Sequence, residues 1–160
     1  MSDSHSQKRT KLEALNELKY EMRLHYRHAR LYRRLRALVA LVGALGSASA
    51  FSSAFAGNPK LLAVGGVLLA ICGMADLVLD FSSRATAHEL ARKAYCNLEV
   101  RWANLSLAQV DAELAAISAD DPGHIESLRW PSHNDALRSL GYVEHLKKLN
   151  WLERFFDFVA

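Results

Sequence analysis

Two acidic residues, Asp76 and Asp80, interrupt a stretch of sequence that is otherwise apolar, and they are the first candidates for chemistry. They are four residues apart, so on a helix they share one face. A carboxylate surrounded by hydrocarbon costs about 2.5–3.5 kcal/mol at the centre of a helix and less near its end. A polar path for ions, pairing with a cation, or protonation would offset that cost.

The elements that position these acids are two long apolar runs. The first run, 37–57, has no charged residue, and the second, 61–81, carries only the two acids. A hydrocarbon core of about 30 Å needs about 20 helical residues, so each run is long enough to cross it. We predict transmembrane helices over 37–57 and 61–81, joined by a turn at 58–60. A soluble hairpin buried in a bundle is the alternative, but both runs are apolar all round, whereas a surface helix keeps a polar face.

The depth of the two acids follows from the helical rise. Asp76 lies about 22 Å along the helix from Leu61, inside the hydrocarbon, and Asp80 lies about 28 Å along it, near the boundary. In an antiparallel hairpin, Asp80 falls opposite the end of the basic segment, within reach of Arg33 or Arg36. We therefore expect Asp80 to be paired. For Asp76 no cation is at hand, so a polar path, protonation and snorkelling of the side chain toward the interface all remain open.

The first run also carries polar and small residues at helical spacings. Ser49 and Ser53 join Asp76 and Asp80 as candidates for lining a polar path. Small residues spaced by four allow helices to approach closely, and they predict a helix-packing face. The residues of this face are Gly43, Gly46, Ser47, Ala50 and Ala54. Packing within the hairpin and packing between copies of the chain are both open.

Charge is concentrated before the first run. Residues 1–36 hold 10 of the 20 Lys and Arg, while the turn offers only Lys60. The positive-inside rule then places both termini in the cytoplasm and the turn outside. Arg23, Arg27, Arg30 and Arg34 form a stripe along one helix face, which favours contact with anionic lipid headgroups. Nucleic acid is the alternative ligand, but no nucleic-acid-binding motif accompanies the stripe, so we expect none.

The remaining sequence predicts helices on the cytoplasmic side, because no segment alternates like a strand. The predicted class is an all-α membrane protein, a two-helix transmembrane hairpin with long cytoplasmic helical extensions. Outside the hairpin the expected segments are a disordered stretch at 1–9, a basic helix at 10–36, a cytoplasmic helix at 82–118, a linker at 119–133 and a C-terminal helix at 134–158.

Motifs of common enzyme classes are missing from the sequence. The pair Gly65-Gly66 lacks the ending of a phosphate-binding loop, and neither a GxSxG nor an HExxH motif occurs. The seven histidines show no metal-ligand spacing with cysteines or acids. His25 and His28 share a helix face among arginines and are expected at the surface. We predict no enzyme activity, no cofactor and no metal site.

Parts of the chain resemble the SLATT superfamily, two-helix membrane proteins of bacterial conflict systems. The shared features are a basic helix with Tyr32-Arg33-Arg34-Leu35, a first span rich in Ser and Ala, and a proline in the turn. The most similar stretch follows the second span, from Asp80-Phe81-Ser82-Ser83-Arg84-Ala85 through His88-Glu89-Leu90-Ala91 to Tyr95 and Leu98-Glu99, and the likeness covers about residues 20–118. The resemblance implies a membrane effector that forms pores when a sensor fires. Family members are often encoded beside nucleotide-signal synthases or reverse transcriptases, so the sensor is expected to be a separate chain.

Two functions are therefore expected. The first is a homo-oligomeric effector that permeabilises or perturbs the inner membrane in a prokaryotic defence system, with lipids and a separate sensor as its partners. The second is a membrane-anchored helical adaptor, whose hairpin only tethers a cytoplasmic partner. The acid at position 76 and the serines favour the first, and the long C-terminal part favours the second.

Overall fold

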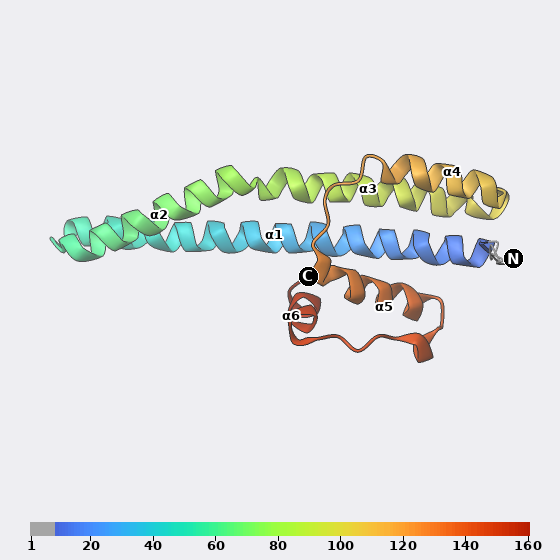
Figure 1. The fold of residues 1–160 in the computed structure, drawn as a ribbon. Coiled ribbons are helices and arrows are strands. Elements are labelled where there is room, and N and C mark those ends of the chain that lie inside the picture. Colours follow the sequence, from blue (N-terminus) through green and yellow to red (C-terminus); the bar gives the residue numbers. More distant parts are fainter. Residues whose placement is uncertain (1–8) are drawn as a thin grey trace, which may run out of the picture. The chain divides into compact units, whose positions relative to one another are not determined.

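The computed structural model describes residues 9–160, and this part of the chain is helical without any strand, which confirms the all-helical class (Figure 1). The predicted disorder at 1–9 falls, except for Arg9, outside the described residues. The helices are α1 (Lys11–Phe55), α2 (Pro59–Leu79), α3 (Phe81–Arg101), α4 (Leu107–Ser118), α5 (Arg129–Ser139) and α6 (Trp151–Val159), with the short 3-10 turns η1 (Trp102–Asn104), η2 (Glu126–Leu128) and η3 (Val143–His145).

The chain packs as two units. The hairpin unit comprises residues 29–86, and the helical unit comprises the described residues up to 28 together with 87–160. Two helical runs, Lys11–Phe55 and Pro59–Asn104, are long and apolar enough to cross a membrane. Helix α1 continues from the basic segment into the first apolar run without interruption.

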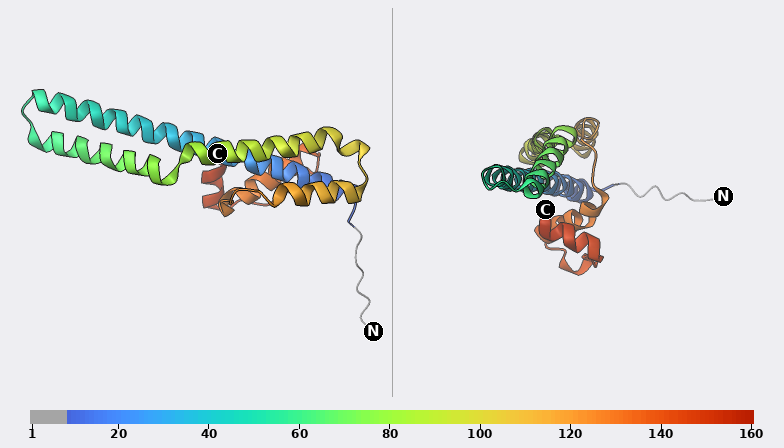
Figure 2. Two further views of the ribbon diagram at one scale, coloured as in Figure 1. Left: turned by 90° about the horizontal axis from the view of Figure 1, so that it is seen from above. Right: turned by 90° about the vertical axis from the view of Figure 1, so that its left-hand side faces the viewer.

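The hairpin unit contains the second part of α1, the whole of α2, which runs back antiparallel to it, and the first residues of α3 (Figure 2). Gly57, with φ +64°, ends α1 in the left-handed region that glycine adopts without a Cβ clash. Asn58 Oδ1 then accepts a hydrogen bond from Leu61 N at 3.3 Å, and Pro59 occupies the start of α2, where a missing N–H is no loss. The turn therefore spans residues 56–58, about two residues before the predicted 58–60, because Pro59 and Lys60 already belong to α2.

A bend at Asp80 separates α2 from α3. Asp80 is left-handed, with φ 41° and ψ 56°, and its N–H donates to Asp76 O at 3.1 Å as the last bond of α2. Its Oδ1 accepts a hydrogen bond from Ser83 N at 3.2 Å in the first turn of α3. Asp is one of the few side chains that visits this backbone region, and it also caps helix N-termini well. Asp80 thus ends one helix and begins the next.

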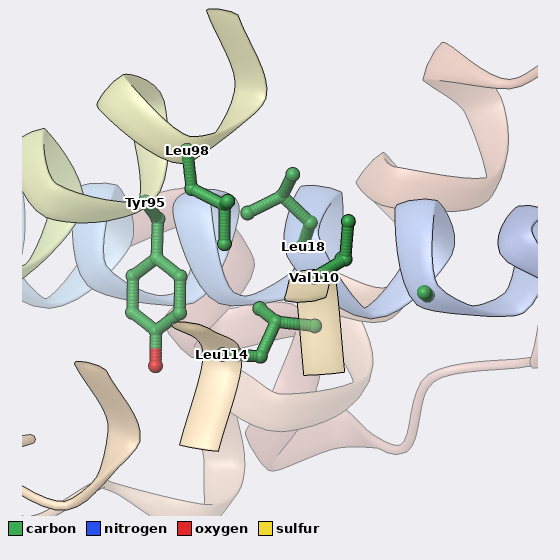
Figure 3. Packing of buried hydrophobic residues seen from close by; sticks show 6 residues of the cluster. Leu18, Tyr95, Leu98, Val110 and Leu114 are labelled. Atoms are coloured by element: carbon green, nitrogen blue, oxygen red, sulfur yellow. The ribbon is translucent and has the colours of Figure 1, made fainter. Parts of the chain in front are cut away.

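The helical unit has a core built from α1, α3 and α4. Its buried side chains point toward one another in Figure 3, namely Leu18, Tyr95, Leu98, Val110 and Leu114. The predicted single helix at 82–118 is wrong, because η1 follows α3 and the chain turns back before α4. Ser106 and Gln109 form a capping box there, in which each side chain binds the other's backbone N–H. The return places Val110 and Leu114 against α3.

The C-terminal part also differs from the predicted single helix at 134–158. Helix α5 begins earlier, at Arg129, because Pro131 is tolerated in a first turn whose N–H groups have no intrahelical acceptor. It ends at Ser139, two residues before Gly141, whose φ is +84°. A second capping box, Asn150 with Glu153, starts α6. The connecting loop is fixed to α5 because Asn134 exchanges two hydrogen bonds with the backbone of Lys147, at 2.8 and 2.9 Å.

Candidate functional site

The two helices of the hairpin unit meet at a seam of small residues. A Cβ placed on Gly65 would lie 2.7 Å from Gly46 O and 2.8 Å from Ala50 N. A Cβ on Gly43 would lie 3.5 Å from Cys72 Cβ. The small-residue face thus has a partner inside the hairpin, helix α2, for Gly43, Gly46 and Ala50. Ala54, at the far end of the predicted face, is exposed.

The serines of the first apolar run bond mainly to their own helix. Ser47 Oγ donates to Gly43 O at 2.8 Å, and Ser53 Oγ donates to Ser49 O at 2.7 Å. Ser53 is only 5% exposed, so it does not offer its hydroxyl to an open surface. Ser49 itself is exposed. Serine hydroxyls in apolar helices commonly donate to a carbonyl of the preceding turn, because this hydrogen bond needs no partner from another helix.

Asp76 lies in a groove of about 370 Å³ along the hairpin. The groove combines apolar walls with four side chains that carry polar or thiol groups, from Arg36, Ser47, Cys72 and Asp76. The structure therefore differs from the expectation that no cation is near Asp76, since Arg36 lines the same groove. Arg36 also donates to Ser82 Oγ at 3.2 Å, near the Asp80 bend. The groove thus contains an acidic and a basic side chain together with apolar walls.

For Asp80 the structure shows a backbone role. The predicted pairing with Arg33 or Arg36 does not form, because within residues 9–160 the Asp80 carboxylate is used as the cap of α3. Its position near the end of the apolar run is explained by the left-handed bend it must support. A role of Asp80 in a polar path stays a prediction, and Asp76 is the acidic candidate that has no such backbone role.

The arginine stripe is divided between surface and interior. Arg27 is only 9% exposed, and its guanidinium contacts Asp135 Oδ2 and Asp157 Oδ1, each at 2.7 Å. The prediction that Arg27 contacts lipid headgroups is wrong, because two carboxylates of the C-terminal helices already hold it. Arg23, Arg30 and Arg34 are exposed, and headgroup contact stays a prediction for them.

A buried histidine cluster in the helical unit is absent from the sequence predictions. His25, His28 and His88 are each at most 1% exposed, so the expectation that His25 and His28 lie at the surface is wrong. The rings of His28 and His88 stack with centroids 4.5 Å apart, and His25 Nδ1 lies 3.0 Å from His88 Nδ1. His124, which is exposed, borders the cluster with its ring centroid 5.4 Å from that of His25.

Two carboxylates face His25 from different segments. His25 Nε2 is 3.2 Å from Asp121 Oδ2 and 3.9 Å from Glu21 Oε2, but neither contact is aligned as a hydrogen bond. Tyr95 donates its hydroxyl proton to Asp121 Oδ2 at 2.6 Å. Glu21 comes from α1, one turn before His25, whereas Asp121 follows α4. The fold therefore brings three acid–base groups to one buried point.

Burial dominates the electrostatics of this cluster. It lowers the pKa of His28 to about 4 and that of His88 to about 3, so both rings are neutral at pH 7. It raises the pKa of Glu21 to about 7. For Asp121 burial also acts to raise the pKa, but the neighbouring His25 and the Tyr95 hydroxyl outweigh it and hold the pKa below its usual value.

One part of this site could have been found in the sequence. Glu21 and His25 are spaced by four residues on a helix, which places both side chains on one face. His88 and Asp121 join them only through the three-helix core, and no local pattern indicates that meeting. Comparison with known proteins adds no template, since no family model, curated protein or solved structure matches this chain.

Proposed function

We propose that this chain is a membrane protein that assembles with copies of itself and perturbs or permeabilises a bacterial inner membrane. The apolar exterior of the hairpin unit carries the proposal. Only 17% of the most apolar stretch of α1, and 11% of that of the run beginning at Pro59, is buried. Large side chains are exposed along both helices, among them Leu38, Leu41, Leu45, Phe51, Phe55, Leu61, Val64, Val67, Ile71, Met74, Leu77 and Val78. Exposure of so large an apolar surface to water is unfavourable, whereas contact with the acyl chains of a bilayer is favourable.

The groove that contains Asp76 supports assembly. A carboxylate and a guanidinium facing acyl chains would each be costly, whereas a second copy placed over the groove would surround them with polar groups. Grooves from several copies that face one axis would form a polar path lined by Asp76, with Arg36 near its end. The exposed Ser49 would add a further polar group only if it faces the same axis.

The proposed place in a defence system, with a separate sensor that triggers assembly, is supported by the resemblance to the SLATT superfamily. The sensor would bind outside the membrane, and the helical unit offers the larger surface for it. Both termini would then lie in the cytoplasm, as the ten basic residues before residue 37 favour.

The orientation predicts a labelling pattern. In a chain whose native cysteines are replaced, Asn58→Cys is expected to react with a membrane-impermeant thiol reagent in intact cells, because the turn is exposed and external. Ser118→Cys, exposed at the end of α4, is expected to react only after the cells are lysed. Reaction of Ser118→Cys in intact cells, with protection of Asn58→Cys, would reverse the orientation.

If Asp76 lines a polar path, removal of its charge is expected to reduce cation leakage. Asp76→Asn keeps the shape of the side chain and removes its charge, so insertion and assembly are expected to persist while cation leakage from liposomes falls several-fold. Asp80→Asn is the matched control. It removes a charge four residues away, yet asparagine also accepts the left-handed conformation and can cap α3. Leakage is measured at equal protein incorporation for all three forms, and equal leakage from Asp76→Asn and the parent would exclude Asp76 from the path.

A specific observation favours the adaptor as the second candidate. The helical unit has its own core and an apolar groove of about 520 Å³ along α3 and α4, lined in part by Leu90, Ala94 and Ile117. An adaptor could use that groove for a partner while the hairpin serves only as an anchor. Liposomes separate the two candidates, since an anchor alone gives no leakage from the parent chain at any protein density.

A further inference from the structure

Three residues of the helical unit meet in its interior, and each has a buried polar atom without a hydrogen-bond partner. These atoms are Glu21 Oε2, His25 Nε2 and Asp121 Oδ1. The side chain of His25 is fully buried, and those of Asp121 and Glu21 are 8% and 19% exposed. One donor atom from each residue lies within 4.8 Å of those of the other two. Buried polar groups are nearly always satisfied, so three neighbouring residues that each have an unsatisfied atom indicate a missing ligand.

The chemistry of these atoms selects the kind of ligand. A proton on His25 Nε2 can satisfy only one of the neighbouring oxygens, whereas a divalent cation attracts both carboxylates and the imidazole lone pair at once. Imidazole nitrogen with carboxylate oxygen is a donor set that suits Zn²⁺ and similar transition-metal ions. We propose that Glu21, His25 and Asp121 form a binding site for a divalent transition-metal ion, with Zn²⁺ as the reference metal.

The surroundings of the three residues orient them as outer-shell groups do in metal sites. Tyr95 donates to Asp121 Oδ2 at 2.6 Å, which holds that carboxylate and leaves Oδ1 available. When Nε2 of His25 binds a metal, its Nδ1 must carry the proton, and that proton points to His88 Nδ1 at 3.0 Å. A ligand histidine whose second nitrogen donates to a neighbour is the usual arrangement in metal sites.

His28 and His124 have other roles than His25 in this site. His28 Nδ1 donates to Leu24 O at 2.8 Å, and its Nε2 accepts from Ile125 N at 2.7 Å, so both ring nitrogens are occupied and His28 is not a ligand. It fixes the segment that follows Asp121. His124 lies at the edge of the site, and three protein ligands leave a coordination position for water or for this fourth side chain.

A bound metal would join two distant parts of the helical unit. Glu21 and His25 belong to α1, and Asp121 lies in the connection between α4 and α5. The metal would therefore fasten that connection to α1 and stabilise the helical unit, because a ligand that binds only the folded state stabilises it. This site does not depend on the proposed membrane activity, and its test reads metal binding alone.

The test uses the full chain in detergent, purified with a tag that contains no histidine and stripped of metal with a chelator. Zn²⁺ is titrated in competition with a chromogenic chelator, and the parent is expected to bind one equivalent. Asp121→Asn and Glu21→Gln are expected to weaken binding by at least about tenfold, since loss of an outer-shell partner alone costs about 10–100-fold. Asp120→Asn, an exposed acid beside the site, and His145→Gln, an exposed histidine, are the controls and are expected to bind like the parent.

A conservative outer-shell variant guards against misfolding. Tyr95→Phe keeps the ring in the core, removes only the hydroxyl, and is expected to weaken Zn²⁺ binding about 10–100-fold with unchanged helical circular dichroism. Co²⁺ added to the stripped parent is expected to give visible absorption that Zn²⁺ displaces. The proposal is overturned if the parent binds no Zn²⁺ in competition with the chelator, or if Asp121→Asn, Glu21→Gln and Tyr95→Phe all bind as the parent does. It is equally overturned if the Asp120 or His145 control loses binding as strongly as the site variants.

Discussion

Gly65→Ala is expected to force α1 and α2 apart and to destabilise the hairpin by about 3 kcal/mol, the upper part of the range for overpacking. The new Cβ would lie 2.7 Å from Gly46 O, 2.8 Å from Ala50 N and 2.9 Å from Ala50 Cβ. Two of these atoms belong to the backbone, so no side-chain rotation can relieve the contact. The helices must separate at the seam, and every contact beside the seam loosens with it.

A native thiol provides the measurement. A Cβ at position 43 lies 3.5 Å from Cys72 Cβ, a separation at which disulfides form, so Gly43→Cys should crosslink to Cys72 under mild oxidation. Mass spectrometry then gives the crosslinked fraction, which is expected to fall sharply when Gly65→Ala is added. Gly66→Ala is the matched control, because its Cβ has no neighbour within 4 Å. Equal crosslinking in the Gly65 and Gly66 variants would show that the seam is not the contact between these helices.

Arg27→Ala is expected to lower the free energy of unfolding of the helical unit by about 2–3 kcal/mol. Removing one partner of a fully buried ion pair costs about 3–5 kcal/mol, because the other charge stays behind. Here two carboxylates stay behind, those of Asp135 and Asp157, but they are 27% and 39% exposed, and water reduces the cost. Their mutual repulsion acts on α5 and α6, so the C-terminal helices should detach first.

Limited proteolysis and thermal unfolding of the full chain in detergent measure this effect. Cleavage is expected in the loop between α5 and α6, at residues 140–150, well before the rest of the chain is cut. Arg23→Ala, one turn earlier on α1, is the control and should change stability by less than about 0.5 kcal/mol, as exposed substitutions do. If both variants unfold alike, Arg27 contributes no more than a surface arginine.

The helical class and the hairpin could be read from the sequence, because long apolar runs and a proline turn are local signals. Local sequence signals also mark the starts of α4 and α6, namely the capping boxes of Ser106 with Gln109 and of Asn150 with Glu153. The regular spacing of apolar residues across these positions nevertheless favoured the prediction of longer helices. The chain turns back before α4 because this turn buries Val110 and Leu114 in a core that a straight continuation of α3 could not reach.

The residues that were misplaced owe their positions to contacts distant in sequence. Arg27 belongs to a regular stripe of arginines, and nothing near it in the chain distinguishes it from its exposed neighbours. Its partner Asp135 is 108 residues away. His25 likewise meets Asp121 only after α3 and α4 have packed against α1. Periodicity identifies a face of a helix, but it does not reveal whether that face meets solvent, lipid or another helix.

The shortness of the turn bears on how the proposed transmembrane hairpin would enter a membrane. On the proposed orientation, the polar chain that must be carried across the bilayer is the stretch Gly57 to Lys60, with a single positive charge. The two helices can enter the bilayer together, packed against each other. The unfavourable transfer of the serines of the first helix and the acid of the second is then distributed over the pair. Insertion of such a pair needs no translocation of a folded part, and both soluble ends can be synthesised and fold on the side where the ribosome stands.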